Sequence, residues 1–111
     1  MPAPTAAIGT AVFQASATWC APTASGQCRG WGGSALLAAL PTFRYGDPSY
    51  RVRVWFGERH VDVTVVSICD CGIDLSPTAF ARLAPLSRGR IDVEVEGPVA
   101  LLPNSDAGGK P

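Results

Sequence analysis

The stretch RVRVWF-GE-RHVDVTVV at 51–66 constrains the fold more than any other part of the sequence. On both sides of Gly57-Glu58, valines alternate with other residues, which is typical of strands that bury one face. Gly57 can adopt a positive φ in a two-residue turn, so the two segments are predicted to form a β-hairpin. The chain must therefore cover one face of a sheet, and 47% of its residues are hydrophobic.

Two further segments have the pattern of strands. TAVFQASATW at 10–19 alternates imperfectly and ends before a loop that contains Pro22. RIDVEVE at 90–96 alternates Ile and Val with acidic residues, so we expect a strand with one buried and one solvent-facing side. Strands therefore dominate the predicted structure.

Two short helices are predicted between these strands. SALLAAL at 34–40 would begin at Ser34 as its N-cap and end at Pro41. SPTAFARLA at 76–84 would begin at Ser76, with a proline at the first helical position. Short strands with two small helices indicate a mainly β protein, a small barrel with helical insertions.

The length of the chain indicates its domain organisation, and its charge indicates which partners it can bind. We expect one barrel domain at 10–96, an N-terminal arm at 1–9 and a C-terminal tail at 97–111, because 111 residues suit a single core. The net charge is +0 and like charges form no run, so no nucleic-acid partner is expected. No apolar run approaches the roughly 18 residues of a membrane span, and no secretory signal is visible.

Four cysteines, Cys20, Cys28, Cys69 and Cys71, favour disulfides in an oxidising environment. A bond between Cys69 and Cys71 would close a very small ring, and the two side chains would share one face of a strand. We therefore expect each of them to pair with Cys20 or Cys28. A zinc site fits less well because Cys-x-Cys differs from the spacing of structural zinc sites, and buried free thiols are the remaining alternative.

Short motifs in a characteristic order cover most of residues 10–96. They are ATW (17–19), TASGQ (23–27), SALLAALP (34–41), RVRV (51–54), VDVTVVS (61–67), IDLSPTAFARLAPLSRG (73–89) and IDVEVE (91–96). Their order resembles the double-psi β-barrel family that includes rare lipoprotein A, expansins and the barwin-like endoglucanases. The Cys-x-Cys before IDLS resembles the actinobacterial and phage-encoded versions. The resemblance implies a six-stranded double-psi β-barrel with two short helices.

The resemblance also shows where catalytic groups would be expected. Transglycosylase activity needs a proton donor for the glycosidic oxygen and charge that stabilises an oxocarbenium-like transition state. The family's acidic and histidine positions fall at or near Gln27, Gly30, Leu37 and Ser67, and none of these residues titrates near neutral pH. Whether the chain is an enzyme stays open, but the missing acid–base pair weighs against it.

Asp74 and Asp70 are the remaining candidate catalytic residues. Asp74 resembles the groove aspartate of expansins and barwin-like endoglucanases, although a carboxylate before a helix can equally accept backbone N–H bonds. Asp70 lies three residues after Ser67, so only a bulge in the strand would turn it into the same groove. Asp74 and Ser67 are also candidates for contact with a glycan or a protein partner.

Trp55 and Trp31 are the aromatic candidates for such a contact. Trp55 lies on the polar face of its strand, where its ring can stack on a sugar or on a protein side chain. Trp31 lies in a Gly-flanked loop, whereas Trp19 is expected in the core. His60 is next to the hairpin turn and is expected to be a solvated residue at a strand end.

These features favour a catalytically degenerate double-psi β-barrel that serves as a structural or binding module. Because the chain has two terminal arms and no visible export signal, we expect a virion or extracellular protein, such as a component of a phage tail. Its partners would be neighbouring virion or self subunits, bound through the arms, and cell-wall polysaccharide of the host. The alternatives are a peptidoglycan lytic transglycosylase or an expansin-like wall-loosening protein that uses Asp74, and a small secreted inhibitor. No cofactor and no metal is expected.

Overall fold

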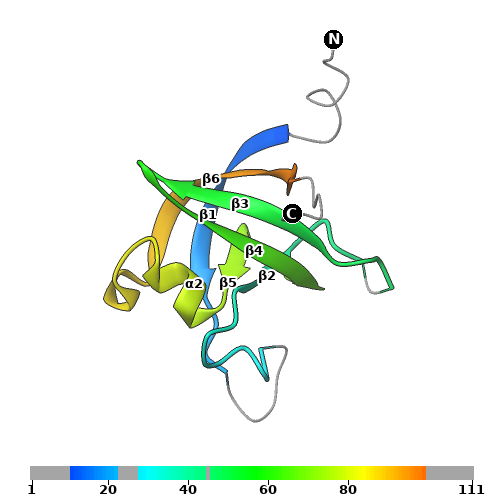
Figure 1. Ribbon diagram of the computed structural model, residues 1–111, viewed down its shortest axis with the longest axis horizontal. Coiled ribbons are helices and arrows are strands. Elements are labelled where there is room, and N and C mark those ends of the chain that lie inside the picture. The colour runs from blue at the N-terminus through cyan, green and yellow to red at the C-terminus, as the bar shows by residue number, and fades with distance from the viewer. Residues whose placement is uncertain (1–10, 23–27, 45, 100–111) are drawn as a thin grey trace, which may run out of the picture.

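The computed structural model describes residues 11–22, 28–44 and 46–99 and shows a closed, mixed β-barrel of six strands (Figure 1). The strands are β1 (Ala11–Trp19), β2 (Leu37–Leu40), β3 (Tyr50–Phe56), β4 (Arg59–Ile68), β5 (Ile73–Leu75) and β6 (Arg90–Val99). Around the barrel they follow the order β1-β5-β2-β4-β3-β6, with β1 and β5 parallel, β2 and β4 parallel, and the other pairs antiparallel. The predicted mainly β barrel is confirmed.

The predicted hairpin is present as β3 and β4. Val52 pairs with Val63 and Val54 pairs with Val61, and all four side chains are buried. Gly57 has a φ of 62° in the connecting turn, a conformation that a residue with a Cβ rarely adopts. The alternation of valines in the sequence therefore predicts correctly which side of this hairpin faces the core.

β1 and β6 confirm the other two predicted strands, and they pair along most of their length. The register runs from Ala11 opposite Gly97 to Thr18 opposite Arg90. β6 continues to Val99, and its outward-facing residues form a line of acidic side chains. β1 and β6 thus build one continuous side of the barrel wall, with β3 on the other side of β6.

The helix predicted at 34–40 is wrong, because this segment contains strand β2. Ala38 pairs with Val65 of β4 and with Leu75 of β5, so β2 is hydrogen-bonded on both sides. Ala38 and Ala39 are fully buried in the barrel wall. The helical preference of Leu and Ala is worth only tenths of a kcal/mol per residue, and two flanking strands outweigh it.

The second predicted helix is present but shorter, as α2 (Pro77–Ala81), and a 3-10 helix, η1 (Leu86–Arg88), follows it. Ser76 stands at the N-cap position, yet its side chain makes no capping bond. Its buried hydroxyl instead donates to the carbonyl of Ala35 at 2.7 Å and accepts the N–H of Leu37 at 3.1 Å. Ser76 therefore ties the start of α2 to the segment that leads into β2.

The core fills the inside of the barrel, and α2 lies against one end of it beside β1 and β5 (Figure 1). Phe80 of α2 is completely buried in this core. Within the described residues no helix is long and apolar enough to cross a membrane. Other completely or almost completely buried side chains are Val52, Val54, Val63, Val65, Ile73, Leu75, Leu83 and Val95.

Candidate functional site

Asp74 is the middle residue of β5, and its carboxylate is half-buried. The Thr18 hydroxyl of the neighbouring strand β1 donates to Asp74 Oδ1 at 2.9 Å. Burial raises the pKa of the Asp74 carboxyl, and the hydrogen bond from Thr18 acts in the opposite direction. Asp74 is thus a carboxylate held on a strand by a hydroxyl, and no charged side chain contributes to its pKa shift.

The predicted disulfide pairing is wrong: Cys20 is bonded to Cys28, and Cys69 is bonded to Cys71. The prediction assumed that Cys69 and Cys71 share a strand face, but β4 ends at Ile68 and the chain bends before β5. Their Cα atoms are 5.3 Å apart, within the usual range for a disulfide. Each disulfide is therefore local, and neither joins the strand end to the loop after β1.

The sulfur atoms of Cys20 and Cys28 and a carboxylate oxygen of Asp74 lie within 4.8 Å of one another. This is the one such group of potential metal ligands in the part of the chain that the structure describes. The two sulfurs are bonded to each other, so they are not available as the thiolates that a zinc ion binds. In this state the disulfide instead packs beside the Asp74 carboxylate.

Ser67 and Asp70 do not extend this site into a pair of carboxylates. Ser67 is buried on β4 with 6% of its surface exposed, and its strand partner is Ala39 of β2. Asp70 is exposed in the bend between β4 and β5, and it makes no hydrogen bond or ion pair with any described residue. Of the two candidate catalytic aspartates, only Asp74 is held in a defined, partly buried environment.

The three tryptophans have different environments. Trp31 is buried, with 3% of its surface exposed, against Cys28 and Ala39. Trp19 is partly buried, and its indole N–H donates to the carbonyl of Leu86 at 2.9 Å. Trp55 faces outward from β3, as its position in the hairpin predicts, and is the tryptophan best placed to meet a ligand.

Trp55 belongs to a row of side chains that crosses four strands on the outside of the barrel. Gln14 of β1 is opposite Glu94 of β6, and Glu94 is opposite Trp55. His60 of β4 follows on the far side of Trp55, with the ring centroids 4.7 Å apart. The Trp55 N–H donates to Glu96 Oε1 at 3.0 Å, so the indole ring is fixed both by a neighbouring ring and by a hydrogen bond.

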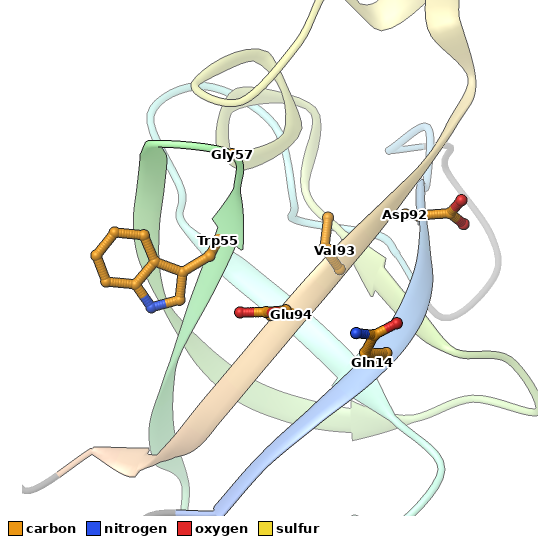
Figure 2. Close-up of a pocket in the computed structure, with 6 residues that line it drawn as sticks. All are labelled: Gln14, Trp55, Gly57, Asp92, Val93 and Glu94. Atoms are coloured by element: carbon orange, nitrogen blue, oxygen red, sulfur yellow. The ribbon is translucent and has the colours of Figure 1, made fainter.

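A depression of about 280 Å³ lies along this row (Figure 2). In Figure 2 the Glu94 side chain extends toward Trp55, the Gln14 amide lies below it, and Asp92 points to the other side of β6. We call this depression the Trp55 pocket; its lining residues are Gln14, Trp55, Gly57, Asp92, Val93 and Glu94.

Among solved structures, the chain is similar to the Streptomyces papain inhibitor. The two sequences are 28% identical, the TM-score is 0.61, and the match covers 78% of this chain and 93% of that chain. No protein-family model and no curated protein matches the sequence. The similarity to the inhibitor is consistent with a small barrel that carries disulfides.

The sequence pointed to Trp55 and Asp74 as candidates but not to the residues around them. The partner of Asp74 is Thr18, which is 56 positions away in the sequence. Gln14 and Glu94 flank Trp55 only because β6 lies between β1 and β3. The alternating pattern of 90–96 could have indicated that Glu94 faces outward, but not which strands lie beside it.

Replacing Asp74 with asparagine should remove a contribution that lowers stability as the pH rises. Because the folded-state pKa of Asp74 is raised above 3.8, the native state holds this proton more tightly than the unfolded chain does. The contribution of Asp74 to stability therefore falls as the pH rises from about 4 through the raised pKa. We expect the unfolding free energy of D74N to increase relative to wild type between about pH 3 and pH 7, measured by urea denaturation.

Asp70→Asn is the matched control, because Asp70 is exposed and the substitution changes the charge by the same amount. The unfolding free energy of D70N should change with pH in the same way as that of wild type. A difference between D74N and wild type that stays constant with pH, or that shrinks as the pH rises, would show that burial does not disfavour the ionised Asp74 carboxyl.

Proposed function

We propose that this barrel acts by binding and not by catalysis, and that it is an inhibitor of papain-like cysteine proteases. The similarity to the Streptomyces papain inhibitor over 93% of that chain carries the proposal. The disulfides and the barrel fit such a protein, because small extracellular domains often depend on disulfides for stability.

The surroundings of Asp74 support the non-catalytic part of the proposal. Glycoside hydrolysis uses two carboxyl groups about 5–10 Å apart, one of which is an acid and the other a nucleophile or base. Asp74 has a threonine hydroxyl beside it, and Asp70 lies in an exposed bend. Leu37 and Ser67 stand at positions where the resemblance expects titratable groups, and Gln27 lies outside the described residues.

We also propose that the six strands are connected as a double-psi β-barrel. A double-psi connection of the strands would agree with the two parallel pairs, β1 with β5 and β2 with β4. It would also agree with the motif order that resembles rare lipoprotein A and the expansins. On this view the chain keeps the scaffold of that family and uses its surface for binding. The assignment to a phage virion that contacts wall glycan through its terminal arms stays a prediction.

An inhibition assay tests the proposed function. We expect papain cleavage of a fluorogenic peptide to fall as the oxidised chain is added. The fall should saturate, because inhibition is complete once every protease molecule has bound the inhibitor. Trypsin, a serine protease, serves as the specificity control, and the reduced and alkylated chain serves as the control for folding. Full papain activity in a large molar excess of the folded chain would refute the proposal.

A further inference from the structure

The Trp55 pocket contains polar groups that the protein itself leaves without partners. Within the described part of the chain, Gln14, Asp92 and Glu94 make no side-chain hydrogen bond or ion pair. They differ in this respect from Glu96, which accepts the indole N–H of Trp55. The pocket therefore offers an aromatic ring, an amide and the Glu94 carboxylate to a molecule from outside, whereas Asp92 points away from Trp55.

Two arginines near the pocket bind other side chains and not Glu94. Arg53 is engaged by Asp62, with Nε 2.7 Å and Nη2 3.1 Å from the two carboxylate oxygens. Arg90 Nη1 donates to the hydroxyl of Ser16 at 3.1 Å. Among the described residues Glu94 has no ion-pair partner, so its carboxylate is available to an incoming ligand.

The chemistry of the pocket fits a guanidinium group best. A planar guanidinium stacks on an indole ring and donates two hydrogen bonds in parallel to a carboxylate, and Glu94 extends toward Trp55 (Figure 2). A neutral sugar could stack on the same ring, but its binding would leave the charge of Glu94 uncompensated. The volume of about 280 Å³ is just below the range of about 300–1,000 Å³ for ligand pockets, which suits one long side chain.

We propose that the Trp55 pocket binds an exposed arginine side chain of a protein partner. The ring of Trp55 is held in place by Glu96 and His60 before the partner arrives, so little side-chain freedom is lost on binding. Glu94 supplies the charge-assisted hydrogen bonds, and Gln14 offers its amide oxygen as a further acceptor. This inference rests on the proposed function only in taking the partner to be a protein.

The test is an NMR titration of the oxidised chain with acetyl-Gly-Gly-Arg-Gly-Gly-amide. We expect the signals of the Trp55 indole N–H and the Gln14 side-chain amide to shift saturably. The same peptide with citrulline, which keeps the shape of arginine but lacks its charge, should give no saturable shift. Glu94→Gln should weaken binding of the arginine peptide about threefold to fivefold, the effect of one exposed ion pair.

Asp70→Asn is the control for the change in net charge. Asp70 follows the last residue of β4, whereas His60 is near the first residue of the same strand. D70N should bind the arginine peptide like wild type. Equal binding of the citrulline peptide, an unchanged affinity in E94Q, or no shift with the arginine peptide would each overturn the inference. Shifts at Trp55 with a chitin hexasaccharide but not with the peptide would assign the pocket to glycan instead.

The outcome is separable from that of the inhibition assay. If papain is not inhibited but the arginine peptide binds at Trp55, the proposed protease partner is wrong and the pocket assignment holds. If papain is inhibited and the peptide does not bind, the proposed function holds and the pocket assignment is wrong.

Discussion

Replacing Phe80 with alanine should lower the free energy of unfolding by about 3–5 kcal/mol, the largest effect that we expect from a single side chain. Phe80 is 0% exposed and heads the largest fully buried side chains of the described residues. It packs from α2 into the core that Ile73, Leu75 and Leu83 share, so truncation removes buried apolar surface and leaves a cavity. Urea denaturation of the oxidised protein, followed by circular dichroism, measures the change.

Phe13→Ala is the matched control, because it removes the same ring from a side chain that is 42% exposed. Its effect should stay below about 1 kcal/mol. Phe80→Leu keeps most of the buried volume, so it should cost less than the alanine variant. Equal losses for F80A and F13A would contradict the placement of Phe80 in the centre of the core.

Replacing Gly72 with alanine should cost about 3 kcal/mol or more, above the usual range for an overpacked core position. A Cβ at this position would lie 2.4 Å from the carbonyl oxygen and 2.8 Å from the nitrogen of Ser16. Both of these atoms belong to the backbone of β1, so no flexible side chain can move aside. The parallel pairing of Ala17 with Ile73, which starts one residue later, would have to shift.

Gly32→Ala is the control for glycine replacement itself. A Cβ there would meet only the ring of Pro22, at 3.5 Å, an ordinary van der Waals contact. The change in unfolding free energy for G32A should stay within about 1 kcal/mol of zero. If G72A unfolds at the wild-type urea midpoint, the close approach of this bend to β1 is wrong.

The sequence allowed the hairpin and the outward direction of Trp55 to be predicted, because both depend on local alternation. Successive side chains of a strand point to opposite faces, so Val52 and Val54 face the core while Arg53 and Trp55 face outward. The strand at Leu37–Leu40 could not be predicted in this way. Its Leu and Ala residues favour a helix locally, and only the strands on both sides explain its conformation.

For the candidate site, the sequence predicted only what depends on a residue's position within its own strand, such as the outward direction of Trp55. That Asp70 is exposed and Asp74 half-buried depends on the bend after Ile68, which also brings Cys69 and Cys71 together. The sequence contains no clear signal for the end of this strand, so the pairing of the cysteines was assigned wrongly. The neighbours of Trp55 depend on strand order around the barrel, a property of the whole fold.

We expect this barrel to act by binding and not to cleave glycan. The decisive experiment is to incubate the oxidised chain with purified peptidoglycan and to measure soluble muropeptides by chromatography and mass spectrometry. We expect wild type and D74N both to release no more product than buffer does. Release of muropeptides by wild type that is lost in D74N would contradict this expectation, because Asp74 would then be a catalytic acid.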